Sequence, residues 1–313
     1  MRRLVWLAPL VAGCTVQGNF GSLVSPDADP LHPYPAPRGD FVPAVGSDAT
    51  LEIACWNIEN FPATPRTPSL VADVIASLDL DVVVVEEIAN EAAWDELLAR
   101  LPDHDGVLST HRYTDTEYQK IGVIYRSSLV AVGQPTLLFT DEGYTFPRPP
   151  LSIAVTVDDA TIELIGIHLK AGREDLDAER RRDAVVALDA HLRAQIDGGA
   201  EPEVVVLGDY NERVTDPASR EVLAPLLGAP DRYTVRSEPR ALAGGYTYLG
   251  FGGSFIDHVT TTVALDARWG GARLEVPPLN ITIPGYRDEI SDHLPVVVIV
   301  PRPQPPQATP KND

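Results

Sequence analysis

The sequence has 313 residues, of which 44% are hydrophobic, and a formal net charge of −20 at pH 7. This length and apolar content are those of a globular chain with a sizeable core. The charge argues against binding nucleic acid by bulk attraction, which arises from Lys and Arg on phosphates, and it fits a site that concentrates divalent cations.

The amino-terminal residues have the pattern of a secretory signal. Two arginines precede a short apolar run, 4–11, and small residues then lead to Cys14. The run is far shorter than the ~20 apolar residues that a membrane span needs. The stretch resembles a bacterial lipoprotein signal, which implies cleavage before Cys14 and a lipid anchor on it. Thr15 follows, without the Asp that would indicate retention in the inner membrane.

We therefore expect an extracytoplasmic protein that contacts a membrane through its lipid anchor only, with the outer membrane favoured. The alternative is an ordinary secretory signal with a chance cysteine.

Composition divides the rest of the chain into three parts. Residues 14–48 are rich in Pro, Gly, Asp and Ser, which predicts a semi-extended linker, because such segments cannot build a core. Residues 302–313 are similar and are predicted to be a disordered tail. Residues 49–301 are expected to form one domain without internal repeats, in which Cys55 is a buried free thiol.

The first part of this domain alternates between strands and helices. Strands are predicted at 50–56 and at 80–88, the latter a Val-rich run. Apolar residues at helical spacing predict helices at 69–79, with Ser69 as the N-cap, and at 91–101.

Further along the chain, several strands follow one another directly. They are predicted at 121–126, 129–139, 151–157 and 161–169, and a hairpin at 157–161 joins the last two. The longest helix is predicted at 175–196, and the remaining elements are a strand at 203–211, a helix near 217–227 and strands at 253–261 and 295–300. Strands outnumber helices, which predicts mixed sheets packed face to face with helices outside.

Polar side chains gather where these strands end. The clusters are Asn57 with Glu59, Glu86 with Glu87, His168, Asp209 with Asn211, Asp257 with His258, and Asp292 with His293 before the last strand. Taken singly, each of them is better explained as a solvated strand end. Together at one edge, they would suit a hard, oxygen-liganded cation and proton transfer.

Six short segments resemble the endonuclease/exonuclease/phosphatase superfamily in order and approximate spacing. They are WNIEN, VVVVEEI, GIHLKAG, LGDYN, FIDHV and SDHLP, and the resemblance covers about residues 50–300. It implies a four-layer α/β sandwich made of two mixed, mostly antiparallel sheets with helices outside. It also implies hydrolysis of phosphodiester bonds by direct attack of water.

The resemblance implies a Mg²⁺ site, with Mn²⁺ or Ca²⁺ as alternative cations. Glu87 matches the principal metal-binding glutamate, although the preceding position, commonly Gln, is here Glu86. Asn57 would support the metal and bind the phosphate, and Asp292 would contribute to the metal site.

The resemblance also implies the catalytic residues. Asp209 and Asn211 match the pair that orients the attacking water and handles its proton. His168 matches the histidine that donates to a phosphate oxygen. His293 matches the histidine that pairs with a strand-end carboxylate, here Asp257, and contacts the phosphate or acts as base.

Three other features bear on the active site. Tyr118 occupies the place of an active-site tyrosine in some members, with a packed core tyrosine as the alternative. Arg148, in YTFPRPPL, resembles an arginine of secreted deoxyribonucleases that meets the DNA backbone. The run 180–182 of three arginines is interpreted as the solvated face of the long helix, balanced by neighbouring acidic residues.

The sequence thus predicts a metal-dependent phosphodiesterase, expected to be monomeric, with DNA as the favoured substrate. One alternative is a phosphatase or phospholipase C-type enzyme acting on an inositol phosphate or a lipid headgroup. Another is a binding lipoprotein that retains the motifs without turnover.

Overall fold

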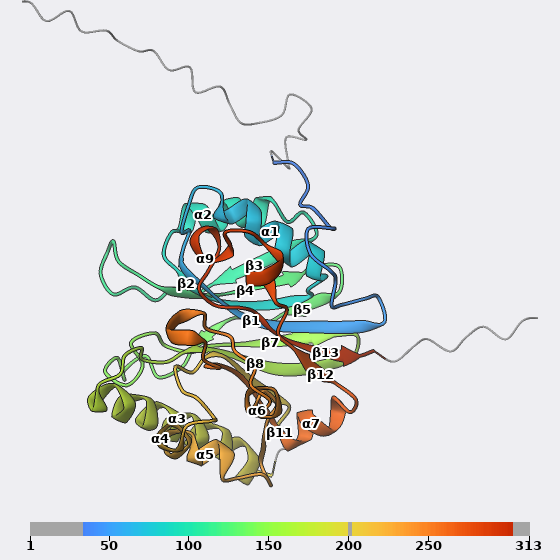
Figure 1. The fold of residues 1–313 in the computed structure, drawn as a ribbon. Helices are drawn as coiled ribbons and strands as arrows, with labels where there is room; N and C mark the ends of the chain where they lie inside the picture. Colours follow the sequence, from blue (N-terminus) through green and yellow to red (C-terminus); the bar gives the residue numbers. More distant parts are fainter. Residues whose placement is uncertain (1–33, 200–201, 303–313) are drawn as a thin grey trace, which may run out of the picture.

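Two β-sheets packed face to face form the centre of the computed structural model, which describes residues 34–199 and 202–302 (Figure 1). The six-stranded sheet has the order β12-β13-β1-β2-β4-β3. Its strands are β1 (Thr50–Phe61), β2 (Val82–Ile88), β3 (His104–Leu108), β4 (Lys120–Arg126), β12 (Arg273–Glu275) and β13 (Val296–Pro301).

The seven-stranded sheet has the order β10-β11-β9-β8-β7-β5, with β6 paired to β7. Its strands are β5 (Val130–Val132), β6 (Thr136–Leu137), β7 (Leu151–Val157), β8 (Ala160–His168), β9 (Val204–Asp209), β10 (Tyr233–Val235) and β11 (Asp257–Thr262). In both sheets one pair of strands is parallel, β1 with β2 and β8 with β9, and the others are antiparallel.

Helices cover the two outer faces (Figure 1). Those beside the six-stranded sheet are α1 (Thr67–Leu78), α2 (Glu91–Ala99), α8 (Leu279–Thr282) and α9 (Tyr286–Glu289). The others are α3 (Asp175–Asp197), α4 (Pro217–Val222), α5 (Ala224–Leu227), α6 (Glu238–Leu242), α7 (Val263–Arg268) and the short 3₁₀ helix η1 (Gly250–Gly252). The predicted four-layer α/β sandwich is thereby confirmed.

Alternation along β2 shows why both faces of a central strand are apolar. Val82 and Val84 pack between the two sheets, whereas Val83 and Val85 pack under the helices. Successive side chains of a strand point to opposite faces, so a strand covered on both sides needs an unbroken apolar run.

Some predicted elements differ in detail. The strand expected at 129–139 is divided into β5 and β6, with Gly133 and Pro135 between them. Helix α1 begins at Thr67 with Pro68 in its first turn, so Ser69 lies inside the helix and is not its cap. The short strands β3, β10 and β12 lack an apolar pattern long enough to predict them.

The segment before β1 contradicts part of the expected linker. The Arg38 side chain forms an ion pair with Asp73 of α1, and Val42 is only 5% exposed and belongs to the core. The Val45 amide donates to the carbonyl of Leu78. Residues 38–45 therefore pack against α1 and the core, although they form no helix or strand.

The sequence predicts a buried free thiol at Cys55 and a lipid anchor at Cys14. Cys55 is buried and free, as expected. Cys14 and the expected signal lie outside the described residues. Within those residues, no helix combines the length and apolar character needed to cross a membrane.

Candidate active site

One edge of the sandwich collects the polar strand ends from both sheets. Residues 57, 87, 168 and 209 lie in the carboxyl-terminal parts of β1, β2, β8 and β9, whereas Asp257 is the first residue of β11, and Asp292 and His293 precede β13. Backbone pairing fixes this convergence, because Asn57 is in register with Glu86, and His168 and Asp257 both pair with Asp209.

The side-chain amide of Asn57 joins the two sheets. Its Nδ2 lies 3.2 Å from Glu87 Oε1 and 3.2 Å from Asp209 Oδ2, and so donates toward a carboxylate of each sheet. The second oxygen of Glu87 accepts from the Asn60 amide at 2.8 Å, and Asp209 Oδ1 accepts from the Asn211 amide at 2.8 Å. The two carboxylates are thereby held in fixed orientations at the edge.

Glu86 and Glu87 are clearly distinguished by the structure. Glu86 lies on the same face of β2 as Val82 and Val84, which pack between the two sheets. It is fully buried, and neither of its carboxylate oxygens has a hydrogen-bond partner. Burial, followed by the charges of Asp257 and Asp209, raises its pKa well above the ordinary value. Glu87 instead lines the catalytic cleft, because its left-handed backbone, φ 64°, turns its side chain to the edge.

His168 lies opposite the two carboxylates. Its Nε2 is 3.6 Å from Asp209 Oδ2 and 3.8 Å from Glu87 Oε1. Burial lowers the pKa of His168 well below its ordinary value, and the positive charge of Arg148 lowers it further. The imidazole is therefore neutral at pH 7.

His293 forms a buried pair with Asp257. Its Nδ1 is 2.9 Å from Asp257 Oδ2, and its Nε2 is 4.0 Å from Asp209 Oδ2 and 3.9 Å from Asp292 Oδ1. Burial alone would lower the pKa of His293, but the charge and hydrogen bond of Asp257 outweigh it and raise the pKa to about 10. His293 is thus held as a cation with Nε2 directed toward the other carboxylates.

The backbone around His293 is also fixed. Ser291 Oγ donates to the Asn57 carbonyl at 2.7 Å and accepts from the His293 amide at 2.9 Å. Trp56 Nε1 donates to the His293 carbonyl at 3.2 Å, and Tyr286 OH donates to the same oxygen. These bonds explain why the polar SDH sequence precedes a buried strand.

Backbone strain concentrates at this edge. Glu59, Asn60, Glu87 and Asn211 all have positive φ, between 40° and 64°, although none is glycine. Such conformations cost of order 1–3 kcal/mol each and persist at functional sites where the surroundings enforce them.

The carboxylates carry more negative charge than the described residues balance. Burial raises the pKa of Asp209 to about 7, and the charge of Asp257 adds to the effect. Burial and the charge of Asp292 likewise raise the pKa of Glu59. Excess negative charge on oxygen donors is what a divalent cation relieves, so these residues fit one.

Two neighbouring donor sets could hold that cation. Ligand atoms of Asp209, Asp257 and His293 lie within 4.8 Å of one another. However, His293 already bonds Asp257 and is protonated, which leaves its nitrogen without a free lone pair. The oxygen donors Glu87, Asn57 and Asp292, predicted from the sequence, therefore suit a hard cation better.

A cleft of about 1030 Å³ opens over these residues. Besides Glu87, His168, Asp209, Asn211, Asp292 and His293, its lining includes Glu59, Tyr248, the loop after β8, and parts of α3 and α4. Glu59 was seen in the sequence without a role, and its carboxylate accepts from the Asp292 amide at 3.0 Å.

Tyr118 and Arg148 lie outside the described lining of the cleft. The Tyr118 hydroxyl accepts from the Glu91 amide at the start of α2. Arg148 is 8% exposed and donates to the Leu169 carbonyl at 3.0 Å. The structure therefore places Arg148 behind His168, and its contact with a DNA backbone stays a prediction.

The interpretation of residues 180–182 as a solvated face is wrong for Arg181. This side chain is 5% exposed, and its Nε is 2.6 Å from Glu212 Oε1. It also donates to the carbonyls of Lys170 and Gly172, at 2.8 and 3.0 Å. Sequence reasoning missed this pair because Glu212 follows Asn211 in a loop far from α3 in the sequence.

Comparison with known proteins gives one family and many similar folds. The model of the Endonuclease/Exonuclease/phosphatase family matches residues 54–293. No curated protein matches the sequence.

Similar solved structures include TDP2 of D. rerio complexed with single-strand DNA product, with 17% identity, a TM-score of 0.61, and coverage of 80% of this chain and 99% of that one. The 3′ phosphatase NExo from Neisseria, bound to a product DNA hairpin, has 18% identity, a TM-score of 0.58, and coverage of 80% and 100%. The mannosyl-6-phosphatase Bt3783 of Bacteroides thetaiotaomicron has 15% identity, a TM-score of 0.57, and coverage of 80% and 99%. These likenesses show the fold.

Proposed function

Because the chain belongs to the endonuclease/exonuclease/phosphatase family, and so to metal-dependent hydrolases of phosphate esters, we propose that it cleaves phosphodiester bonds of DNA by direct attack of water. The observation that carries the proposal is the Asn57 amide, which holds Glu87 and Asp209 in front of His168 and His293. Oxygen ligands for a metal ion, a proton acceptor and the protonated His293 thus lie in one cleft.

Asp209 is the proposed acceptor of the proton from water. Two fixed hydrogen bonds, from Asn57 and Asn211, orient its carboxylate. Its raised pKa of about 7 lies near working pH, where a general base is most effective. No covalent intermediate with the protein is needed.

The two histidines are proposed to bind phosphoryl oxygens. His293, protonated and oriented by Asp257, would place a full positive charge beside the charge that develops in the transition state. Neutral His168 would donate one hydrogen bond from Nε2. Asn57 and Asn211 would complete the contacts to the phosphate.

Glu87, with Asn57 and Asp292, would hold the cation, for which we propose Mg²⁺. A bound divalent cation polarises the phosphoryl group and stabilises a negatively charged leaving oxygen. Mn²⁺ and Ca²⁺ are the other oxygen-binding candidates for the same donor set.

The candidate substrates are DNA and, as the alternative, a small phosphoester or a lipid headgroup. Two similar structures contain DNA, whereas Bt3783 is a sugar phosphatase. The net charge of −20 favours the alternative, a small phosphoester or a lipid headgroup, since it opposes the approach of a polyanion. We favour DNA because Arg182 in the cleft and Arg287 in the neighbouring pocket make no ion pair within the described residues and could bind further phosphates.

The test uses supercoiled plasmid with the chain from Thr15 onward, with Mg²⁺ or EDTA, beside His293→Ala. Nicking that requires both the cation and His293 supports the proposal. If plasmid stays intact with Mg²⁺, Mn²⁺ and Ca²⁺ while inositol phosphates, sugar phosphates or sphingomyelin are hydrolysed, the alternative replaces it.

We also propose that the protein acts outside the cytoplasm, anchored through lipid on Cys14. The support is the sequence alone: the charged start, the short apolar run and the small residues before Cys14. Full-length protein should partition into detergent, and Cys14→Ser should partition into water. Equal partition of the two would contradict the anchor.

A further inference from the structure

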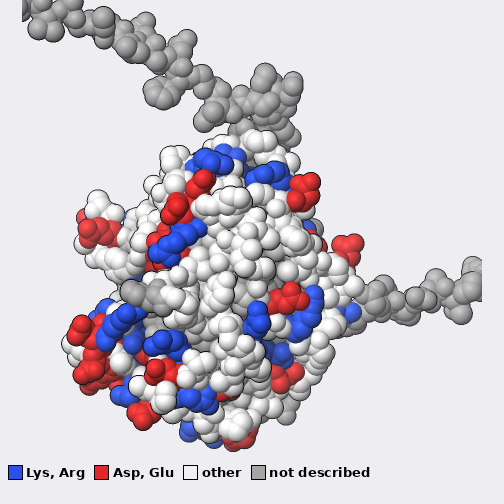
Figure 2. All heavy atoms as spheres, in the orientation of Figure 1, with Lys and Arg blue, Asp and Glu red and all other residues white. Residues whose placement is uncertain are grey.

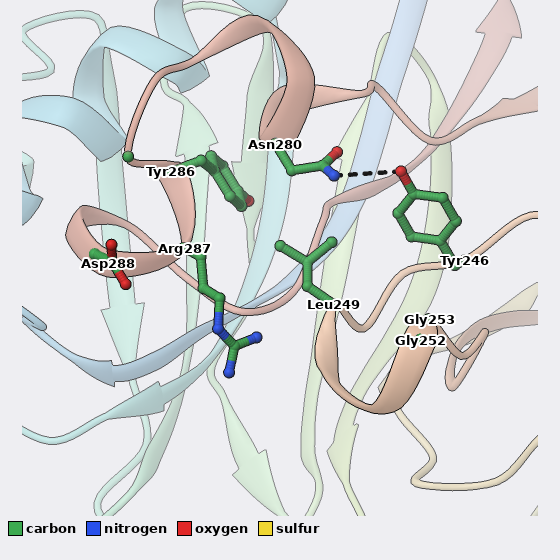
Figure 3. A pocket seen from close by; sticks show the side chains of 9 residues that line it. Tyr246, Leu249, Gly252, Gly253, Asn280, Tyr286, Arg287 and Asp288 are labelled. Carbon is green, nitrogen blue, oxygen red and sulfur yellow. Dashed lines mark hydrogen bonds between the residues drawn. The ribbon is translucent and has the colours of Figure 1, made fainter.

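A second cavity, which we call the side pocket, lies next to the catalytic cleft. Its volume is about 530 Å³, within the range of small-ligand sites. Figure 3 shows its lining, which includes Tyr246, Leu249, Tyr286, Arg287 and Asp288. The hydrolysis proposed above uses none of these side chains directly.

Only a thin wall separates the side pocket from the cleft. Tyr248 and Asp292 line the cleft, whereas Leu249 lines the side pocket. The wall is closed by a backbone hydrogen bond, from the Leu249 amide to the Asp292 carbonyl at 2.8 Å. A group attached to a phosphate in the cleft could therefore extend past Tyr248 into the side pocket.

Arg287 stands at this border. It is exposed and makes no ion pair or hydrogen bond within the described chain, and in Figure 3 its side chain extends toward Leu249 while Asp288 points away. Its positive charge acts on Glu59 and Tyr248, both of which line the cleft.

An unpaired arginine is unusual in this protein. Acidic side chains or carbonyl oxygens engage most of the described basic residues, and Figure 2 shows basic and acidic side chains lying next to each other on this face. Within the described residues, those with neither an ion pair nor a hydrogen bond of their side chains are Arg182, Arg240 and Arg287.

Arg182 lines the catalytic cleft from the other sheet. It lies on α3, whose apolar side packs on the seven-stranded sheet, whereas Arg287 lies on α9, which packs with the six-stranded sheet. The two unpaired arginines thus approach the catalytic residues from opposite layers (Figure 1). Arg240 lines neither cavity.

We propose that Arg182 and Arg287 bind the phosphates on either side of the scissile one, and that the side pocket receives the nucleoside next to Arg287. This rests on the proposed phosphodiesterase function and narrows its substrate to a nucleic acid strand. Leu249 and Tyr246 offer the apolar and aromatic surface on which a base packs. A substrate with a single phosphate, bound at the catalytic residues, would leave both arginines unused.

The experiment measures kcat/KM of the full-length protein on a tetranucleotide cleaved at its central phosphodiester. In two further substrates, one outer phosphate or the other is replaced by an uncharged methylphosphonate. Bis(4-nitrophenyl) phosphate, which has no neighbouring phosphate, is the minimal substrate. The variants are Arg287→Ala, Arg182→Ala and, as matched control, Arg240→Ala.

Arg287→Ala and Arg182→Ala should each have a kcat/KM about ten-fold lower on the tetranucleotide, which corresponds to the loss of one charge-assisted hydrogen bond. Neither should change on the minimal substrate, and Arg240→Ala should match the parent throughout. Neutralising one outer phosphate should lower kcat/KM of the parent about ten-fold but should not lower that of Arg287→Ala further. Neutralising the other outer phosphate should lower kcat/KM of the parent about ten-fold but should not lower that of Arg182→Ala further.

Four results would overturn the inference. If the loss of kcat/KM from the arginine substitution and the loss from the methylphosphonate multiply, the arginine and that phosphate do not interact. Equal losses on both substrates would show that the arginine supports the catalytic residues instead. Cleavage of the tetranucleotide with no loss in either variant would remove this inference alone, whereas failure of the parent on every phosphodiester would remove the proposed function as well.

Discussion

At the scale of single residues, adjacent Glu86 and Glu87 have opposite environments. Glu86 is fully buried without a hydrogen-bond partner, and burial raises its pKa well above the ordinary value, which favours the neutral carboxyl. Glu86→Gln puts a neutral side chain of similar shape in the same place, so kcat/KM should stay within about three-fold of the parent. Glu87→Gln removes a proposed cation ligand and should cost about 10²-fold or more.

Isothermal titration with Mn²⁺ checks the same pair without turnover. Glu86→Gln should bind Mn²⁺ like the parent, and Glu87→Gln should bind it at least about ten-fold more weakly. The reverse order would mean that Glu86, and not Glu87, holds the cation.

Asp257 sets the charge of His293. Without that carboxylate, burial dominates, and the pKa of His293 should fall from about 10 to near or below its ordinary value. We expect Asp257→Asn to lower kcat/KM at pH 7 by about 10²-fold, because a neutral His293 stabilises developing charge less well. NMR titration would check this, with His258, whose pKa burial lowers to about 4, as an internal reference. A His293 pKa that stays near 10 would contradict this account.

At the scale of elements, Arg181 ties α3 to two active-site loops. It pairs with Glu212, beside Asn211, and donates to two carbonyls of the loop after His168. Arg181→Ala would leave Glu212 buried and unpaired, which should lower the free energy of unfolding by about 3–5 kcal/mol. It should also lower kcat more than it raises KM, since loop positions and not substrate contacts are lost.

The matched control for Arg181 is Arg193, on the same helix. Its i,i+4 partner Asp189 keeps a hydrogen bond from the Tyr233 hydroxyl, and the Arg193 side chain is itself 42% exposed, so Arg193→Ala should cost much less stability than Arg181→Ala. Urea unfolding of both variants makes the comparison. A similar small loss for Arg181→Ala would show that the buried pair does not hold the loops.

The same elements show what could be predicted from the sequence. Strand-end residues such as Asp209 and His293 could be located because each borders a Val-rich run whose end is plain in the pattern. Arg181 could not, since a charged helix face looks the same whether it meets water or a buried Glu212. The side pocket escaped prediction because α8 and α9, each four residues long, have no periodic pattern.

At the scale of the whole molecule, the site exists only when the two sheets pack together. Asn57 and Glu87 come from one sheet, and His168 and Asp209 come from the other. Several ionisable groups are buried in the process, and their raised pKa values make folding take up protons. Stability therefore depends on pH through the same packing that builds the site.

Between pH 6.5 and 8.5, the cation-free native state should hold more protons than the unfolded state. Burial raises the pKa of Asp209 to about 7 and that of Glu52 to about 8, and His293 reaches about 10, so the unfolded forms of all three lose their protons at lower pH. Stability must then fall as pH rises, by a few kcal/mol at most, or about 10 °C in Tm. Below pH 6.5 the lowered pKa values of His168 and His258 act in the opposite direction, so the decline should become shallower there.

Calorimetry in EDTA across this range tests the prediction. Glu52 lies near the start of β1, five residues before Asn57, and outside the lining of the cleft. Glu52→Gln, which is neutral at every pH, should therefore flatten the decline without changing kcat. Mg²⁺ should flatten it further, because a cation among Asp209, Glu87 and Asp292 favours their ionised forms. A Tm that is constant or rises from pH 6.5 to 8.5 in EDTA would mean that these buried carboxyls are ionised in the native protein, and that their charge is balanced without a cation.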